Sequence, residues 1–447
     1  MDGNCVANEV HLFFSGSNQI VYGLEMARAI KEVQSKLDEI AMDERLLEAL
    51  QPHANLKELM LAGYRGRILS SGFASLKNLV KIQIKNCRKL LRLPLLGPLV
   101  ALEEFSLQCL ESLEYIQSGP TPSSSSSSSS NELQLLHSLK SLEIKSCTNL
   151  IGWSAEKKSS QLLCLSQLTI YNCPQMVSTP KFSAHVEHIE LWGVKSELLD
   201  DLVDSLPPPS SPLLSRFTSL KLHKIEGLLV LPQGLLPHLT CLESLSIGRC
   251  NDFTTLSPAV IQHLTSLQRL ELSSCPCLAS WKGGYDHGGD EKKNKMTMMP
   301  ICALPYLHSL RFFNLPKLVH LPEWLRHSSN LQKLQMNDCV ALKGLPEWLT
   351  KLAALKSLEV SLCGDLSTRC RGQTALDWPN IAQIPNIEVD DRVIQKDGCY
   401  LGLDQGQGED YSEDEDDDDE EEESTPDTLA NGIARLTCSL FRRCFLC

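Results

Sequence analysis

The chain has 447 residues, 42% of them hydrophobic, and a formal net charge of −13. This length allows two or three ordinary domains or one long repeat array with a large core. The negative charge argues against broad nucleic-acid binding, so we expect no nucleic-acid partner. Thirteen of the acidic side chains lie in residues 409–423, and the rest of the chain is therefore close to neutral.

Residues 1–50 are predicted to form a separate helical segment. Within it, residues 22–50 place apolar side chains at the a and d positions of a heptad: Met26, Ile30, Val33, Leu37, Ile40 and Leu47. Two interpretations stay open, a short coiled coil or an amphipathic helix that caps the first repeat. The first ten residues, MDGNCVANEV, have neither a basic nor an apolar signal region, so no signal peptide is predicted.

Residues 51–391 contain an internal repeat with the pattern Lxx(L/I)x(L/I/F)xxCxxLxxL. Twelve copies start at Leu56, Leu79, Leu102, Leu139, Leu165, Val186, Phe217, Leu242, Leu267, Leu307, Leu331 and Leu355. A period in the twenties is typical of a leucine-rich-repeat solenoid. We therefore predict an α/β fold, a horseshoe of about twelve repeats with parallel strands on its concave face.

The Leu-x-Leu part of each repeat alternates between core and solvent, which predicts one short strand per repeat. At the Cys position the chain is expected to turn inward, so that a small thiol is buried and meets backbone groups. Seven residues occupy this position: Cys87, Cys147, Cys173, Cys250, Cys275, Cys339 and Cys363. Neighbouring thiols stand in parallel and do not pair easily, so we expect a reducing compartment. This favours the cytoplasm, with the nucleus and the periphery of the plasma membrane left open.

The stretch LPEWL occurs twice, at 321–325 and 345–349. Pro322 and Pro346 follow the last core leucine of their repeats and are expected to end the extended backbone. The next three residues then open the return segment on the convex side. Trp324 and Trp348 are predicted to cover adjacent turns of that side, which is a structural role.

Three intervals between repeats are longer than the others. They contain SGPTPSSSSSSSSN (118–131), PPPSSP (207–212) and KGGYDHGGDEKKNKMTMM (282–299). Insertions in a solenoid lie in loops, sometimes beside a binding face, and the serine run is typical of a low-complexity loop.

After the last repeat, DWPNIAQIPNIEVDD (377–391) keeps apolar spacing without the repeat pattern and is predicted to be the C-terminal cap. Residues 392–447 are predicted to be a disordered acidic tail with a Cys-rich end. Cys438, Cys444 and Cys447 lie there among apolar and arginine side chains. They are candidates for lipidation and membrane association, against the alternative of an unmodified tail.

Motifs for catalysis or cofactor binding are missing from the sequence. There is no GxxxxGK[ST] phosphate loop and no GxSxG nucleophile motif, and His185 and His188 have no third metal ligand nearby in the sequence. We therefore expect no enzyme activity, no cofactor, no metal site and no nucleotide binding.

The cysteine at the turn, the two LPEWL units and the ending DWPNIAQIPNI together resemble the leucine-rich-repeat region of plant intracellular immune receptors of the coiled-coil nucleotide-binding class. NLKELMLAGYRG (55–66) is similar to the start of one subregion of that array. Residues 20–41 resemble the end of the coiled-coil domain of the same receptors. In that family a nucleotide-binding module separates these two parts, and here they are almost adjacent. The resemblance implies a truncated or fused relative without the ATP-dependent switch, or an incomplete gene model.

These observations predict a protein-binding leucine-rich-repeat protein in plant defence, whose partner is a pathogen effector or a host protein. Four residues follow the second strand leucine of their repeats and are predicted to be exposed on the concave face: Tyr171, Trp192, His223 and Phe313. Aromatic side chains are favoured at binding hot spots.

Two alternatives to this function stay open. The acidic tail also resembles that of nuclear phosphoproteins that bind histones or other basic proteins, and the chain could be an inert fragment.

Overall fold

A computed structural model describes residues 55–69, 76–94, 96, 98–117, 136–154, 161–182, 185–207, 216–279 and 304–401. The chain divides into two units, Met1–Leu403 and Asp404–Cys447, and all described residues lie in the first. The predicted helix at 22–50, the insertions at 118–131 and 282–299, and Cys438, Cys444 and Cys447 lie outside the described residues. These predictions therefore stay predictions.

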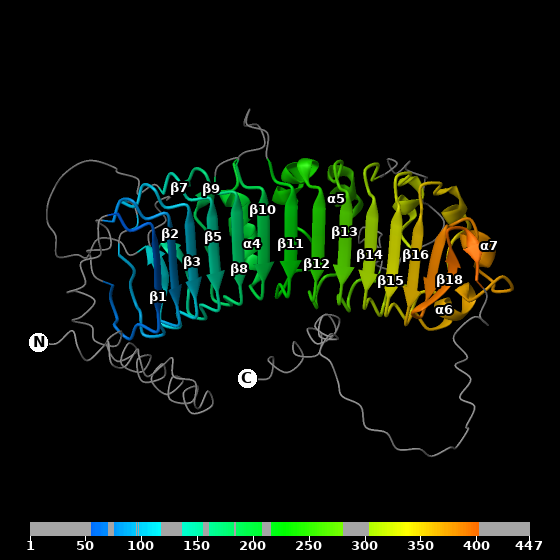
Figure 1. The fold of residues 1–447 in the computed structure, drawn as a ribbon, viewed down its shortest axis with the longest axis horizontal. Helices are drawn as coiled ribbons and strands as arrows, with labels where there is room; N and C mark the ends of the chain where they lie inside the picture. The colour runs from blue at the N-terminus through cyan, green and yellow to red at the C-terminus, as the bar shows by residue number, and fades with distance from the viewer. Residues whose placement is uncertain are drawn as a thin grey trace, which may run out of the picture. The chain divides into compact units, whose positions relative to one another are not determined.

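One sheet of fifteen strands runs through the described part of the chain (Figure 1). Its first twelve strands are β1 (Glu58–Ala62), β2 (Lys81–Lys85), β3 (Glu104–Gln108), β5 (Ser141–Lys145), β8 (Gln167–Tyr171), β10 (His188–Trp192), β11 (Ser219–His223), β12 (Ser244–Gly248), β13 (Arg269–Ser273), β14 (Ser309–Phe313), β15 (Lys333–Asn337) and β16 (Ser357–Ser361). They pair in parallel and in chain order. The sheet ends with β17 (Asn386–Val389), β18 (Arg392–Lys396) and β19 (Cys399–Tyr400).

Each of the first twelve strands begins two residues after a predicted repeat start, which confirms the twelve repeats and the solenoid fold. The second and fourth residues of a strand point into the core, as Leu168 and Ile170 do in β8. Neighbouring strands are in register, so Leu168 pairs with Ile189 of β10. The core is therefore one continuous row of apolar layers. The first, third and fifth residues of each strand form the opposite, outward face, which the sequence predicts to be concave.

A residue with positive φ follows each of these twelve strands, beginning with Gly63 and Asn86 and ending with Leu362. In eleven of the twelve turns its N–H donates to the carbonyl of the residue at the end of the next strand, for example from Asn172 to Trp192 over 2.6 Å. These bonds tie each turn to the following repeat and hold the turns in a row.

The repeat cysteines lie next to these turns, and all seven are buried, as predicted. Each thiol lies near the carbonyl oxygen two residues earlier, as between Cys363 Sγ and the Ser361 oxygen at 3.3 Å. The other six make the same contact at 3.3–3.5 Å. The residues at this position therefore serve in core packing.

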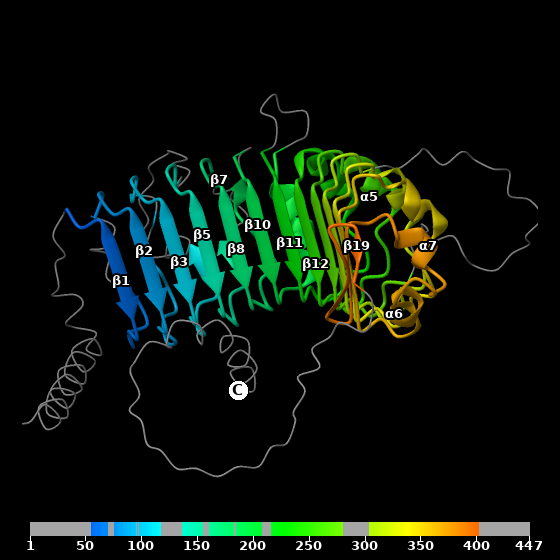
Figure 2. The ribbon, with the colours of Figure 1, turned by 45° about the vertical axis from the view of Figure 1, so that its right-hand side comes forward.

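The return segments contain short helices and two-stranded sheets. They are β4 (Tyr115–Gln117) with β6 (Gly152–Ser154), β7 (Gln161–Leu162) with β9 (Lys181–Phe182), α4 (Ser196–Ser205), η2 (Gln233–Cys241), α5 (Pro258–His263), η3 (Glu323–His327) and η4 (Glu347–Lys351). Figure 2 shows the strands β1, β2, β3, β5, β8, β10, β11 and β12 side by side in one row.

The two LPEWL stretches behave as predicted. Pro322 and Pro346 are the N-cap residues of η3 and η4, two 3₁₀-helices that contact each other. Trp324 and Trp348 are both buried against the core. Their role is therefore structural.

The predicted boundary at residue 391 is shifted, because the sheet continues beyond it. After α6 (Asp365–Cys370) and α7 (Trp378–Ile381), β17 pairs in parallel with β16, and β18 and β19 extend the sheet in antiparallel order as far as Tyr400. Asp390 and Asp391 both have positive φ, which reverses the chain between β17 and β18. The antiparallel pair covers the edge that a further parallel repeat would otherwise occupy.

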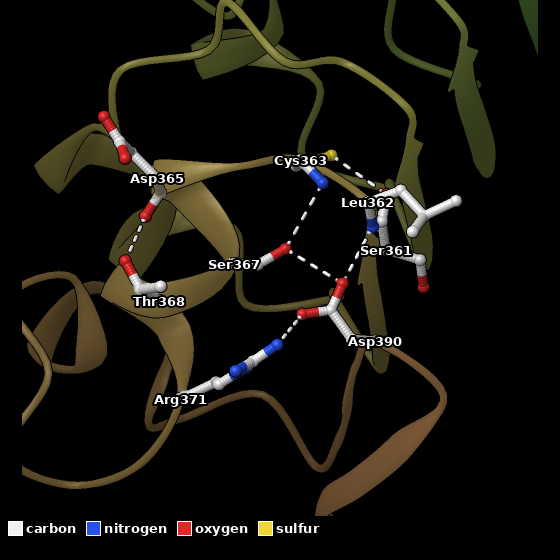
Figure 3. Close-up of polar contacts among 8 residues, drawn as sticks. All are labelled: Ser361, Leu362, Cys363, Asp365, Ser367, Thr368, Arg371 and Asp390. Carbon is white, nitrogen blue, oxygen red and sulfur yellow. Dashed lines mark hydrogen bonds and ion pairs between the residues drawn. The ribbon is translucent and has the colours of Figure 1, made fainter.

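A polar cluster fixes this end of the array (Figure 3). The Asp390 carboxylate accepts hydrogen bonds from the Leu362 N–H over 2.8 Å and from Ser367 Oγ over 3.1 Å, and it pairs with Arg371. Ser367 Oγ also accepts a bond from the Cys363 N–H over 3.3 Å. The cluster joins β16, α6 and β17.

Candidate functional site

Three of the four predicted site residues lie side by side on the outward face. Tyr171, Trp192 and His223 each end their strands, and the pairing of β8, β10 and β11 places them directly opposite one another. Insertions in the intervening segments do not change this, because they leave the strand register intact. The three residues are partly buried.

Their rings form one stack across the three strands. The Tyr171 and Trp192 ring centroids are 5.5 Å apart with an interplanar angle of 21°. The Trp192 and His223 centroids are 5.0 Å apart with an angle of 23°. These values are typical of offset stacking, which adds to the stability gained from area burial. We call Tyr171, Trp192 and His223 the aromatic stack.

Gly248 on the next strand makes room for His223. A Cβ atom built on Gly248 would lie 2.5 Å from His223 Nδ1 and would also overlap Ser273 Oγ. On the same strand, Ser246 Oγ lies 3.2 Å from His223 Nε2, within hydrogen-bond distance. The imidazole is therefore held between Trp192 and β12.

Burial is the main cause that lowers the pKa of His223 below its ordinary value. Lys221 and Arg249 lower the pKa further, while Glu190 and Glu271 oppose them. The ring is consequently neutral at pH 7 and adds no charge to the stack.

Arg249 also contacts the aromatic stack. It is the turn residue that follows β12, and its guanidinium carbon lies 5.2 Å from the Trp192 ring centroid. A cation at this distance from an indole face is attracted by the ring quadrupole. The sequence does not predict Arg249 as a site residue, because the contact with Trp192 spans two repeats. A basic residue at the turn position was the available signal.

Phe313 does not join the stack. It ends β14, and the corresponding residues of the two strands between it and His223 are Gly248 and Ser273. Its ring instead faces Arg311, whose guanidinium carbon is 5.8 Å from the ring centroid. The structure thus separates the four predicted residues into a group of three and a single aromatic residue.

A hollow of about 440 Å³ lies beside the stack, where β11 to β14 end. It is lined by Lys224, Arg249, Asn251, Ser274, Pro276 and Asn314. Arg249 therefore connects the two features, since it contacts Trp192 of the stack and also lines the hollow. We call these six residues the basic hollow.

Within the described ranges, no three His, Cys, Asp or Glu side chains are placed to hold a metal ion. None of the helices described there is long and apolar enough to cross a membrane.

Two family models match the chain. Residues 21–110 match the R13L1/DRL21 leucine-rich repeats, and residues 216–364 match the leucine-rich repeats of plant disease resistance proteins similar to RPS2. The first match covers residues 22–50 as part of a repeat family, so the coiled-coil interpretation of that segment stays a prediction.

Curated relatives come from Solanum bulbocastanum. RGA1 is 33% identical over 138 residues, which are 30% of this chain and 13% of that protein. Disease resistance protein RGA2 is 31% identical over 133 residues, which are 29% of this chain and 13% of that protein. The chain thus matches only a small part of the length of these relatives.

Solved structures that align include the leucine-rich-repeat domain of the type III effector XopL, at 19% identity and a TM-score of 0.31, over 73% of this chain and 79% of that domain. An internalin, InlF, from Listeria monocytogenes aligns at 12% identity and a TM-score of 0.39, over 77% of this chain and 81% of the internalin. The two family models and the Solanum relatives agree with each other. Over the matched residues, the repeats of this chain are therefore similar to the leucine-rich repeats of plant disease-resistance proteins.

Proposed function

We propose that this chain is a non-enzymatic, protein-binding leucine-rich-repeat protein of plant defence. The aromatic stack is the centre of its binding surface, and its partner is a pathogen effector or a host protein met in the cytoplasm. The similarity of the repeats to those of plant disease-resistance proteins supports the role in defence. The outward face of the sheet supplies the surface that a partner would contact.

One observation carries this proposal: three stacked rings lie partly exposed on a face whose other residues are mostly small or polar. Beside the rings, Glu190 of β10 and Lys221 of β11 form an ion pair of 3.3 Å. Each of these two residues lies two positions before the ring of its own strand. Apolar rings surrounded by polar groups are the arrangement of a hot spot and its rim.

The rings also bury part of each other's surface, which by itself would stabilise the sheet. Their mutual contacts hold them in one arrangement before any partner arrives, so that binding costs little side-chain entropy. The faces that remain exposed are the area that a partner covers.

The test uses the full chain, tagged and expressed in leaf tissue, with co-purifying proteins quantified by mass spectrometry. A partner should be recovered with wild type and lost with the Tyr171→Ala, Trp192→Ala double variant, because each hot-spot truncation costs roughly 2 kcal/mol, or about 30-fold in affinity. The matched control is Met60→Ala, which changes a 65% exposed apolar residue on the outward face of β1.

A protein that is recovered equally with the double variant and with wild type does not bind through the stack. A variant lacking residues 404–447 distinguishes the proposed function from the histone-binding alternative. That deletion should leave recovery of a partner bound by the stack unchanged, and it should abolish recovery of a basic partner held by the acidic residues.

A further inference from the structure

We propose that the basic hollow binds a carboxylate side chain of an acidic protein segment, while the aromatic stack holds an apolar side chain of the same segment. This inference rests on the proposed function, because it gives the chemistry of the partner that covers the stack. The hollow and the stack act as one site because Arg249 lines the hollow and contacts Trp192 of the stack.

The positive charge of the hollow is not compensated within the protein. Among the described residues, no carboxylate lies within ion-pair distance of Lys224 or Arg249, and both side chains are exposed. Three acidic residues on β10, on β13 and in the turn after β12 are already engaged. Glu190 pairs with Lys221 at 3.3 Å, Glu271 pairs with Arg311 at 3.8 Å, and the Asp252 carboxylate accepts a 3.2 Å hydrogen bond from the Gly227 N–H.

A second hollow, on the outward face of the sheet, shows the opposite arrangement. It measures about 310 Å³ and lies over β2, β3, β5 and β8. There Lys81 pairs with Glu104 at 2.6 Å, and Ser106 donates a 2.7 Å hydrogen bond to Glu143. Its charged groups satisfy one another and leave little for a ligand. Of these two hollows in the described part of the chain, the basic hollow offers unpaired charge.

The remaining lining residues suit a carboxylate. Asn251, Ser274 and Asn314 add amide and hydroxyl donors around the two cations, and the Asn314 amide already donates to Ser274 Oγ over 3.4 Å. Hydrogen bonds between charged groups and such donors are stronger than neutral ones. A nucleic acid fits less well, since a chain of phosphates would also meet Glu190 and Glu271 beside the hollow.

The strand spacing predicts how far apart the apolar and the acidic residue of one bound segment should be in its sequence. Adjacent strands lie about 4.8 Å apart, so β10, which carries Trp192, is about 10 Å from the end of β12, one of the two central strand ends at the hollow. An extended peptide rises about 3.3 Å per residue, and about three residues span that distance. The partner segment should therefore have an acidic residue about three positions from an apolar one.

The test measures fluorescence anisotropy of a labelled peptide with repeated Leu-Ser-Ser-Glu units against the purified full chain at low salt. A second peptide carries Gln in place of each Glu. We expect the Glu peptide to bind at least about tenfold more tightly, because a hydrogen bond between charged groups contributes about 1.5–3 kcal/mol. The Lys224→Glu, Arg249→Glu variant should remove this preference. Lys333→Glu, which reverses an exposed charge at the start of β15, should keep it.

Trp192→Ala removes the apolar contact and also the ring on which the Arg249 guanidinium lies, so it should weaken both peptides. Thermal unfolding confirms that each variant is folded. Equal binding of the two peptides to wild type, no binding of either, or a preference that persists in the double charge variant would overturn the inference. If both peptides bind equally and Trp192→Ala weakens both, the stack still binds protein segments and only the carboxylate assignment fails. Tighter binding of a short DNA duplex than of the Glu peptide would also overturn it.

Discussion

The N–H of Leu362 donates a 2.8 Å hydrogen bond to the carboxylate of Asp390, at the place where the eleven preceding turns donate to a backbone carbonyl. Asp390 is the fifth residue counted from the start of β17, the same position that supplies the carbonyl in the other repeats. Its backbone has a φ of 47° and turns the chain back into β18. A side chain has thus replaced the carbonyl in the last turn of the parallel array.

Replacing Asp390 by Ala should destabilise the protein. The change leaves the Leu362 N–H without its acceptor and removes the bonds from Ser367 and Arg371. We expect the free energy of unfolding to fall by about 1–3 kcal/mol, measured by urea denaturation. Glu388→Ala, on the outward face of the same strand, is the control and should change it by less than about 0.5 kcal/mol. Equal losses in the two variants would show that the cluster has no special role.

The same cluster predicts a pH dependence. Burial acts to raise the pKa of Asp390, but the hydrogen bonds from Arg371, Leu362 and Ser367 outweigh it and hold the pKa below the ordinary value of 3.8. A carboxyl whose pKa is lower in the folded state contributes stability above its unfolded pKa and loses it as the pH falls through the folded value. The stability difference between wild type and Asp390→Asn should therefore be constant from pH 5 to 7 and shrink below about pH 4. A difference that is unchanged down to pH 2 contradicts this.

Gly248→Ala should disturb the aromatic stack more than the fold. The added methyl group would lie 2.5 Å from His223 Nδ1, and the imidazole can move because it is at the free end of a side chain. We expect a loss of about 1 kcal/mol or less in unfolding free energy, together with a changed tryptophan emission spectrum. The spectral change should vanish when Gly248→Ala is made in a Trp192→Phe background. If the spectral change persists in the Trp192→Phe background, it comes from another tryptophan, and this would contradict the prediction.

Trp348→Ala should be among the most destabilising single changes in the return segments. The side chain is only 9% exposed, and removal of a buried indole costs about 3–5 kcal/mol. Trp348 Nε1 is buried without a hydrogen-bond partner among the described residues, so Trp348→Phe loses no hydrogen bond and should cost clearly less. Urea denaturation of both variants measures the difference. Similar losses in the two would show that Phe does not recover the packing of the indole, and they would contradict this prediction.

The repeat cysteines should resist alkylation in the native protein. Burial raises the pKa of Cys250 to about 12, so its thiol stays protonated at pH 8 as well as shielded from solvent. Cys164 and Cys399 are exposed and should react first. Peptide-resolved mass spectrometry after brief treatment with N-ethylmaleimide, with and without urea, compares them. Labelling of Cys250 at the rate of Cys164 without urea would contradict the buried position.

The C-terminal boundary shows what the repeat pattern alone could not indicate. The apolar spacing of DWPNIAQIPNIEVDD predicted a cap, but β18 and β19 have no leucine period and were assigned to the tail. Their place in the sheet depends on the reversal at Asp390 and Asp391, two residues that carry no repeat signature.

The repeat architecture can be predicted from the sequence alone, because alternation and a fixed period indicate locally which side chains are buried. Leu168 or Cys173 is a core residue whatever its neighbours are. Only the tertiary structure decided that Trp192 stacks on both Tyr171 and His223, that Gly248 leaves space for the imidazole, and that Arg249 reaches back over the indole. These contacts join residues from different repeats. They depend on the register of parallel strands and on side-chain directions across that register, which a pattern within one repeat does not contain.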